Sequence, residues 1–538
     1  MPSTDNNEMA IVWLAAFGSS YVIYKAVSGY LAVSSTLHTL RGPDSPSWLL
    51  GNAHVTRAYR NRTLEDWMRE YGSVFAIHSF FGTKALLVSD TKAASFVLNH
   101  PNEFPKPKNL VNAARNTFGD GLLTAEGFEH KRQRKVINPA FSVAAMRDIT
   151  PIVMQVAHEL RDVWKQQLST STSFSEGIQQ QEIDVVSWFS KTALDMIGLA
   201  GFGYKFNAIH DSSNELAKAF YDLTKNFSII TLMGLLTTFF PVLRYLPTAS
   251  NKANNGSMAV MKRVGSQMVS DKKAEAERLG EGSEVPGKDL LSILIRANMK
   301  ENGAEKLDDE TLLGEISTFL LAGHETTATA MSWGLYWLAK APSLQSKLRE
   351  EVLAVPNDSP SMDELNSLPY LNNVVKELLR LTPPIPTGRR IAALDTVIPL
   401  AQSVIDKNGK EINEIFVRRG EDIMIHTFAS NTTPDIWGPD AFEFRPERFD
   451  KLPEAVSEVP SMYGNLSTFL AGPKGCIGFR VALLEIKAML FALIRAFEFD
   501  IDPMLEITGK FVIALKPSVK GQEEKGAYLP LRISLYQR

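Results

Sequence analysis

One cysteine is the most reactive side chain that the sequence offers. Cys476 is the only cysteine among 538 residues, which excludes an internal disulfide framework and a zinc site built from several cysteines. Glycines at 472, 475 and 478 surround it, and glycine permits the positive φ angles and close backbone approach of a tight loop. Because a helical pattern follows at 481–497, we expect the helix dipole and backbone N–H groups to favour a thiolate. Such a sulfur could be a nucleophile, an inert core residue or an axial ligand to the iron of a macrocycle.

Two further groups combine residue types that could act together. An apolar, helix-like stretch at 312–339 contains Ala-Gly-His-Glu-Thr-Thr at 322–327. Glycine and threonine are poor helix formers, and a threonine hydroxyl can bond a preceding carbonyl and bend the helix. Taken alone, this string indicates only a kinked helix. Glu377 and Arg380 are three residues apart and share one helix face, which taken alone is typical of a surface ion pair.

The loop around Cys476 resembles the haem-thiolate loop of the cytochrome P-450 superfamily. The pattern Phe469-x-x-Gly472-x-Lys474-x-Cys476-x-Gly478 carries this resemblance. It implies that Cys476 ligates the haem iron, that Phe469 shields the sulfur, and that Gly472 and Gly478 shape the loop around the cofactor. Lys474 stands where the family usually has arginine. Lysine can still meet a haem propionate as a point charge, without the bidentate fork of arginine.

The string at 322–327 resembles the oxygen-activation motif of the same family. The resemblance implies that Thr326 hydrogen-bonds the oxygen that the enzyme activates and that Glu325 helps to deliver protons from solvent. Cleavage of the O–O bond requires two protons brought to a dry site. His324 fills a position that varies in the family, and we interpret it as structural.

Segments on either side of the cysteine loop complete the resemblance. Glu377-Leu-Leu-Arg380 and Phe444-Arg-Pro-Glu-Arg448-Phe are similar to the family's E-x-x-R helix and Pro-Glu-Arg-Phe segment. They imply a buried ionic network of Glu377, Arg380 and Arg448 that holds the loop carrying Cys476.

The resemblance also supplies cations for the two haem propionates. The stretch 127–135 is similar to the helix in which the family usually has tryptophan and arginine four residues apart. Here His130 replaces the tryptophan and Arg134 is kept, and residues four apart share one helix face. Arg390 matches a second propionate-binding position. The remaining basic residues of 131–135 are typical of a solvated face, and could also meet an acidic electron donor.

The resemblance implies an oxygen-dependent monooxygenase. Its cofactor is haem b, and one atom of O2 enters a C–H or C=C bond of a small lipophilic substrate. Electrons would come from NADPH through NADPH-cytochrome P-450 reductase or cytochrome b5, since no G-x-G-x-x-G unit follows a predicted strand. A reductase-independent isomerase or peroxygenase and a non-enzymatic membrane protein that binds haem or a lipophile are the alternatives. The retained pair Glu325 and Thr326 argues against both.

Apolar residues in the segments that line the pocket of the family predict a lipophilic substrate. The resemblance places these segments near 105–120, 200–245, 315–327, 386–392 and 510–516, and predicts an apolar cavity. We expect a terpenoid-like natural product, a fatty acid, a sterol or an aromatic xenobiotic, and favour the first. The residues concerned are Phe118, Phe239, Phe240, Phe319, Ile385, Val512, Ile513 and Ala514.

Hydrophobic patterns predict the elements that must position these residues. A helix is expected at 63–71, short strands near 74–89 and 385–430, a mostly helical region from about 140 to 380, and a helix at 478–498. The predicted fold class is therefore mainly α with minor β, and the resemblance implies the cytochrome P-450 fold. With 57 Lys+Arg against 60 Asp+Glu, the net charge of −3 argues against bulk electrostatic binding of nucleic acid.

The N-terminal segment predicts a membrane anchor. Residues 10–24 are apolar or small, although Lys25 makes the run borderline for a spanning helix. A cleaved signal peptide and a buried helix are the alternatives; the former needs a basic leader, whereas Asp5 and Glu8 precede this run. Lys25 and Arg41 follow it, so the remainder is expected in the cytosol at the endoplasmic reticulum membrane. These features resemble membrane-bound eukaryotic members of the family, fungal ones above all. We therefore predict an anchor at 1–40, a Pro/Gly hinge at 41–52 and a catalytic domain at 53–538.

Overall fold

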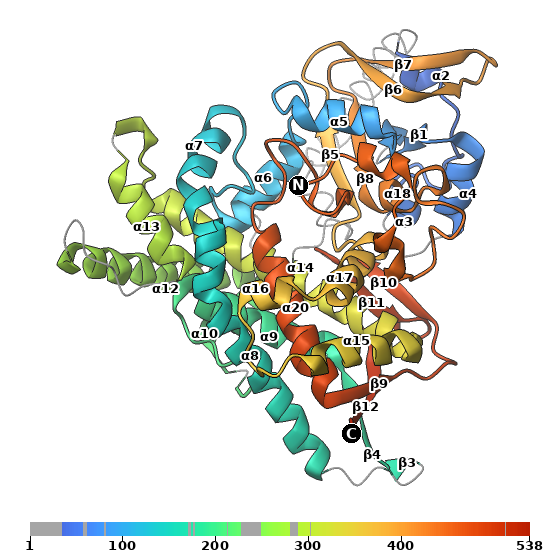
Figure 1. Ribbon diagram of the computed structural model, residues 1–538. Coiled ribbons are helices and arrows are strands. Elements are labelled where there is room, and N and C mark those ends of the chain that lie inside the picture. Colours follow the sequence, from blue (N-terminus) through green and yellow to red (C-terminus); the bar gives the residue numbers. More distant parts are fainter. Residues whose placement is uncertain are drawn as a thin grey trace, which may run out of the picture.

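The computed structural model shows a mainly helical molecule with small sheets along its edges (Figure 1). The expected fold class, mainly α with minor β, is confirmed. The apolar run at 10–24 of the predicted anchor, 1–40, lies outside the described residues. Among those that are described, no helix is both long and apolar enough to cross a membrane. The structure describes residues 35–56, 62–79, 82–170, 174–175, 178–211, 213–226, 249–279, 289–301, 303–511 and 513–537.

Helices fill the middle of the chain, and their ends carry recognisable start and stop signals. For example, Pro342, Pro369 and Pro434 each stand at the first position of a helix, where the missing N–H of proline costs no hydrogen bond. The α-helices are α2 Thr36–Thr39, α3 Ala53–Thr56, α4 Arg62–Tyr71, α5 Thr91–Asn99, α6 Lys108–Phe118, α7 Gly127–Ile137, α8 Val143–Thr170, α9 Val185–Met196, α10 Glu215–Asn226, α12 Ala249–Leu279, α13 Leu290–Lys300, α14 Asp309–Lys340, α15 Pro342–Ala354, α16 Met362–Asn366, α17 Pro369–Leu381, α18 Thr427–Thr432, α19 Pro434–Trp437 and α20 Phe479–Ala496.

The strands form small sheets around the helical body. One sheet has the order β1-β2-β8-β5 and another β3-β4-β12-β9, while β6-β7 and β10-β11 are hairpins. The strands are β1 Val74–His78, β2 Lys84–Val88, β3 Phe174–Ser175, β4 Ile178–Asp184, β5 Thr387–Ile391, β6 Thr396–Ile405, β7 Glu411–Val417, β8 Asp422–His426, β9 Phe497–Asp500, β10 Ile507–Phe511, β11 Leu515–Val519 and β12 Pro530–Leu535. Short helical turns are η2 Asn138–Phe141, η3 Ile197–Phe202, η5 Gly303–Glu305, η6 Pro446–Asp450, η7 Glu454–Glu458, η8 Ser467–Phe469 and η9 Glu523–Lys525.

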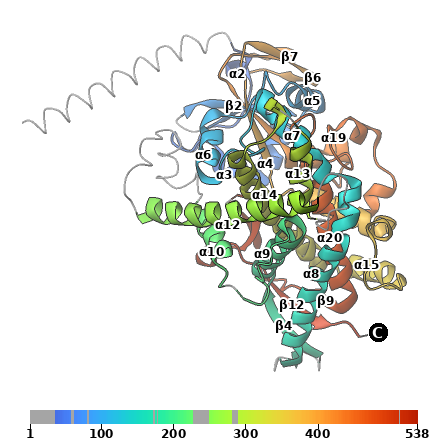
Figure 2. The ribbon, with the colours of Figure 1, turned by 90° about the vertical axis from the view of Figure 1, so that its left-hand side faces the viewer.

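The long helix α14 is the centre of the fold. The Asp308 side chain accepts a hydrogen bond from the Thr311 N–H, and acidic residues in the first turn complement the helix dipole. The helix ends before Pro342, which begins α15. It is helical without interruption through 322–327 and packs against α9, α20, α12, α17 and β11. Figure 2 shows α12 crossing the molecule, with α10 below it and α13 above.

Two sheets connect distant parts of the chain and position site residues. Strand β5 runs antiparallel to β8, with Arg390 opposite Ile423. The polar strand β4 pairs with β12 near the C-terminus, at the bottom of Figure 1. The prediction of a mostly helical region from about 140 to 380 missed β4, because the Gln-Gln-Gln-Glu sequence of 179–182 has no strand pattern of its own and depends on its partner strand.

Candidate functional site

Cys476 lies in the tight loop between η8 and α20. Its backbone N–H donates a hydrogen bond to the Phe469 carbonyl at 2.9 Å, which closes the loop. Gly472 has φ +70°, and a Cβ there would lie 2.4 Å from the Leu98 carbonyl oxygen, so this position requires glycine. A Cβ at Gly478 would instead approach the Phe141 ring at an ordinary 3.8 Å. The packing of the described residues therefore does not require glycine at 478.

The Cys476 thiol combines access with strong desolvation. The side chain is accessible, although many protein atoms surround the sulfur. Burial raises the pKa of the thiol above its usual range, while a hydrogen bond from the Gly478 backbone and the charge of Arg134 act in the opposite direction. In the protein alone, desolvation therefore opposes the thiolate that the helix start was expected to favour. Such a thiol loses its proton when it coordinates a metal ion.

Thr326 lies on the accessible side of α14. Its Oγ1 donates to the Ala322 carbonyl at 2.6 Å, the back-bonding that the sequence suggested. Thr326 is half-buried and Ala322 is exposed, within a helix that is otherwise largely buried. A ligand that approaches this stretch of the helix would meet the threonine hydroxyl.

Glu325 is buried and paired with a residue that sequence reasoning missed. Lys516 Nζ, on β11, lies 2.7 Å from Glu325 Oε2, and His324 Nδ1 lies 3.3 Å from Glu325 Oε1. Burial alone would raise the pKa of Glu325, but the charge of Lys516, and that of His324 when it is protonated, lower it below its ordinary value. Glu325 is therefore held as a carboxylate in a dry environment.

The predicted propionate ligands come together from three separate elements. His130 and Arg134 lie on α7, Arg390 on β5 and Lys474 in the cysteine loop. Burial, followed by the charges of Lys106, Lys474 and Arg134, lowers the pKa of His130 to about 4, so this imidazole is neutral. The Arg134 Nη1 donates to the Gly475 carbonyl at 2.6 Å and so ties α7 to the loop.

Two members of this cluster, Lys106 and Glu126, were not predicted from the sequence. Lys106 Nζ lies 3.9 Å from Glu126 Oε1, and Glu126 also forms an ion pair with Lys474. Burial lowers the pKa of Lys106 to about 8, although Glu126 acts to raise it. Glu126 could have been found, because it immediately precedes the helix that carries the predicted ligands His130 and Arg134. Lys106 lies in an irregular Pro-Lys-Pro segment and had no such signal.

The charges of this cluster fit a group with two carboxylates. Among the described residues, the cations Lys106, Arg390 and Lys474 share the carboxylate of Glu126, and Arg134 lies beside them on α7. Buried positive charge without anions is unfavourable, and burial lowers the pKa of each of these four cations. Two haem propionates would supply the missing negative charge, so the residues present fit the cofactor that the resemblance implies.

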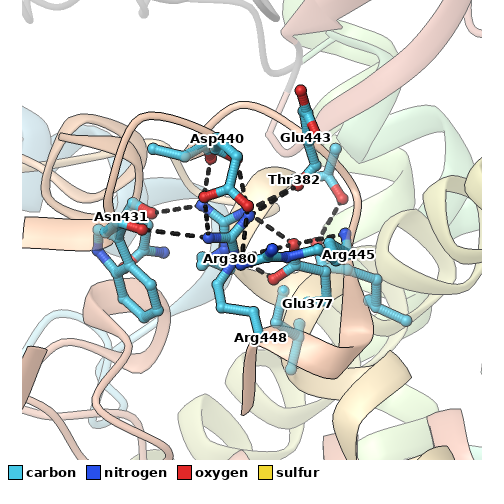
Figure 3. Close-up of polar contacts among 12 residues, drawn as sticks. Glu377, Arg380, Thr382, Asn431, Asp440, Glu443, Arg445 and Arg448 are labelled. Carbon is cyan, nitrogen blue, oxygen red and sulfur yellow. Dashed lines mark hydrogen bonds and ion pairs between the residues drawn. The ribbon is translucent and has the colours of Figure 1, made fainter. Parts of the chain in front are cut away.

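The ionic network expected beside the site is present and buried (Figure 3). Arg380 Nε lies 2.7 Å from Glu377 Oε2, with both side chains 0% exposed. Arg448 Nε approaches Glu377 Oε1 at 3.4 Å, and its Nη1 lies 2.7 Å from Asp440 Oδ1. The Arg445 backbone N–H also donates to Glu377 Oε1 at 2.8 Å. One carboxylate thus organises two buried guanidiniums and the chain around η6.

Hydrogen bonds connect this network to the cysteine loop. Arg380 Nη1 donates to the Asn431 carbonyl at 2.9 Å. The Asn431 side chain in turn accepts from the Ser467 N–H at 2.8 Å and donates to Thr468 Oγ1 at 2.9 Å. Ser467 and Thr468 belong to η8, which ends at Phe469. The network therefore fixes the residue whose carbonyl closes the loop around Cys476.

The residues expected to line an apolar pocket are partly within the described structure. Phe319 is buried and packs edge-to-face on Phe141, with ring centroids 5.4 Å apart. Phe118 and Ala514 are buried, while Ile385 and Ile513 are half-buried. Residues outside the described part of the chain are Phe239, Phe240 and Val512.

Part of the basic run on α7 is already neutralised. Lys135 Nζ lies 3.2 Å from Glu301 Oε2 and 3.3 Å from Glu305 Oε2, and Arg132 pairs with Glu129 at 2.7 Å. This stretch therefore presents less positive charge to an electron donor than its sequence suggests.

Comparisons with known proteins agree with this geometry. The family model described as cytochrome P450 matches residues 40–520. The chain is 37% identical over 540 residues to cytochrome P450 monooxygenase 205 of Postia placenta, covering 98% of each chain. It is 38% identical to cytochrome P450 monooxygenase 128 of the same fungus, covering 94% of each. Ganoderic acid synthetase of Ganoderma lucidum is 33% identical, with 92% of this chain and 93% of that protein covered.

Proposed function

Because this chain belongs to the cytochrome P450 family of oxygen-incorporating oxidoreductases, we propose that it is a haem b monooxygenase that hydroxylates or epoxidises a small lipophilic substrate. The observation that carries the proposal is the accessible Cys476 in a loop braced by the Glu377–Arg380–Arg448 network. The cysteine loop would hold the cofactor, whereas Glu325 and Thr326 on α14 would deliver protons. We propose the catalytic domain at 53–538, with the anchor at 1–40 and hinge at 41–52 holding it at the endoplasmic reticulum membrane.

The substrate class and electron source belong to the same proposal. A relative with the printed name ganoderic acid synthetase and the apolar pocket residues favour a terpenoid-like natural product. Electrons would come from NADPH through NADPH-cytochrome P-450 reductase or cytochrome b5. No nucleic acid takes part.

Each named residue has a distinct task in this function. A haem with a thiolate ligand supplies the activation of O2 when it is bound. Cys476 would provide that thiolate, Phe469 would exclude water from the sulfur, and the cations with His130 would bind the propionates. Thr326 Oγ1 would hold a proton at the substrate side of α14, and Glu325 would move protons to it from solvent.

The carbon monoxide difference spectrum of the dithionite-reduced protein in membranes tests the proposal. A strongly red-shifted Soret band, typical of a haem thiolate, would support it. A band typical of histidine-ligated haem, or the absence of haem in a folded preparation, would contradict it. With reductase present, product formation that depends on NADPH would then separate a monooxygenase from an isomerase.

Replacing Thr326 with alanine is expected to keep the thiolate-type spectrum and to divert NADPH oxidation toward hydrogen peroxide. The variant lacks the hydroxyl that now donates to the Ala322 carbonyl. Productive turnover should therefore fall at least about tenfold. The measurement is peroxide released per NADPH consumed. Ser332→Ala removes the same kind of back-bond two turns along α14 and should leave the ratio unchanged; equal ratios in both variants would remove Thr326 from the mechanism.

Replacing Lys106 with methionine is expected to loosen haem without changing the fold. The variant removes a buried cation close to Glu126, and a lost charged hydrogen bond should speed haem loss about tenfold. Transfer of haem to apomyoglobin, followed by absorbance, measures this rate. Lys108→Met, at an exposed position two residues away, is the matched control. Equal rates in the two variants would exclude Lys106 from the propionate site.

A further inference from the structure

The Glu325 carboxylate is contacted at both oxygens, by residues on two different elements. Lys516 Nζ meets Oε2 at 2.7 Å and His324 Nδ1 meets Oε1 at 3.3 Å. The other ring nitrogen of His324, Nε2, lies 2.9 Å from Ser190 Oγ on α9. Ser190, His324 and Glu325 therefore follow one another at distances of 2.9 and 3.3 Å, and the last of them precedes Thr326 in the chain.

The side chains become more exposed to solvent from Glu325 toward Ser190. The side chains of His324 and Glu325 are 7% and 5% exposed, whereas Ser190 is half-buried. Water can therefore reach the hydroxyl at the α9 end, while the carboxylate at the other end is dry. This gradient is what a path for protons requires, because protons must enter where water does and leave where it does not.

Resting on the proposed function, we propose that Ser190 and His324 relay protons from solvent to Glu325, and that Lys516 is a positioning residue that holds this carboxylate in place and charged. In one transfer, Ser190 Oγ gives its proton to Nε2 while the Nδ1 proton passes to Glu325 Oε1. Solvent then restores the proton on Ser190. One proton moves inward, only O–H and N–H bonds change, and no electron is transferred.

The protonation state of His324 suits this relay. Burial, with a smaller contribution from the charge of Lys516, lowers the pKa of His324 to about 4 despite the opposing charge of Glu325. A neutral imidazole has one donor and one acceptor nitrogen. The ring can therefore accept at Nε2 from the Ser190 hydroxyl, 2.9 Å away. Nδ1 lies 3.3 Å from Glu325 Oε1 but is not aligned for a hydrogen bond in this structure, so the transfer requires a small rotation of the ring.

Lys516 is fixed by the backbone around it. The Leu515 N–H donates to the Pro384 carbonyl at 2.8 Å, and Trp333 Nε1 on α14 donates to the Leu515 carbonyl at 2.7 Å. The start of β11 is thus tied to the same helix that carries Glu325. The start of β11 therefore holds the Lys516 ammonium in a fixed position beside Glu325, as a positioning role requires.

A pH measurement must account for every titratable group near this carboxylate. Lys516 faces it from β11, His324 precedes it on α14 and is contacted by Ser190 of α9, and Glu485 lies on α20 close to Thr327. Burial raises the pKa of Glu485 to about 8, although a hydrogen bond with Thr327 opposes the shift. Glu485 is therefore itself a source of a protonated-carboxyl signal.

The first experiment compares Lys516→Met, Lys516→Arg and Lys520→Met in the holoenzyme. Lys520 pairs with Glu506 on the surface of the same hairpin. Without a cation, burial should raise the pKa of Glu325, so near neutral pH this group stays protonated and cannot accept the next proton from His324. Reductase-driven NADPH oxidation should fall about tenfold near neutral pH in Lys516→Met and recover as pH rises. The arginine variant and the Lys520 control should remain like wild type.

Infrared difference spectroscopy across neutral pH gives a readout that does not depend on turnover. Lys516→Met should show an added protonated-carboxyl stretch that disappears in Lys516→Met/Glu325→Gln, whereas any Glu485 band should persist. A Lys516→Met protein without this band and with NADPH oxidation like that of Lys520→Met would overturn the role of Lys516.

The second experiment tests the relay itself with His324→Gln and Ser190→Ala. Both should slow NADPH oxidation and increase its solvent isotope effect in D2O, by about threefold or more for His324→Gln. Ser187→Ala, at an exposed position on α9, is the control. Isotope effects equal to the control would overturn the relay. A thiolate-type carbon monoxide spectrum in all variants shows that such a failure concerns the relay alone, whereas its absence in the wild-type protein would contradict the proposed function instead.

Discussion

Replacing Cys476 with serine is expected to abolish the thiolate-type carbon monoxide spectrum and to lower oxygenase turnover by about three orders of magnitude or more. A serine oxygen at this position is a poor iron ligand and donates less electron density to the iron than a thiolate. The spectrum of the reduced, carbon monoxide-treated protein and NADPH-dependent product formation measure the two effects.

The same variant should leave the fold of the apoprotein nearly unchanged. The loop is closed by the Cys476 backbone N–H, not by the sulfur, and its shape depends on Gly472. The side chain is exposed, so a serine leaves no cavity in the core. We therefore expect the unfolding midpoint of the haem-free protein to match wild type within the error of the measurement.

These two readouts distinguish a ligand from a structural cysteine. A large loss of stability with a retained thiolate-type spectrum would assign Cys476 to the core, which was one of the readings left open by the sequence. Loss of the spectrum with stability retained would assign it to the iron. Wild-type spectrum and turnover in the serine variant would remove the haem-thiolate proposal altogether.

Local spacing explains why much of the site could be predicted from the sequence. The cysteine loop, the 322–327 segment and the Glu377–Arg380 pair each lie within a dozen residues, so the sequence alone carries their geometry. The helix at 312–339 and the strands near 74–89 were found for the same reason, since apolar periodicity is a local signal.

The contacts that complete the site could not be predicted, because they depend on the tertiary fold. Lys516 is 191 residues from Glu325 in the chain, and only the packing of β11 on α14 brings them together. Lys106 joins the propionate cluster from an irregular segment, where no sequence pattern indicates which way a side chain points. The pKa of the Cys476 thiol could not be predicted either, because burial raises it. A helix start can be recognised in the sequence, but it does not reveal how far the surrounding protein excludes water.

Replacing Glu377 with glutamine is expected to destabilise the protein by about 3–5 kcal/mol. The change leaves the buried guanidiniums of Arg380 and Arg448 without their shared carboxylate, and an unpaired buried charge carries that cost. Urea unfolding of the apoprotein and of the haem-loaded protein measures the effect. Glu447→Gln breaks a partly exposed pair with Lys347 near the same segment and should cost about 1 kcal/mol or less.

Arg380→Met should destabilise the protein at least as much as Glu377→Gln, although it removes a buried charge. Arg380 also donates to the carbonyls of Asn431, Ala441 and Glu443, and methionine would leave these acceptors buried without a donor. Because Asn431 holds η8, haem should be lost at denaturant concentrations below those that unfold the helices. Coincident loss of haem and helix, or a stability equal to that of Glu447→Gln, would mean that this network stabilises the fold without bracing the cysteine loop. If folding fails altogether, the milder Arg448→Lys variant, which keeps the charge, answers the same question by the order of its two transitions.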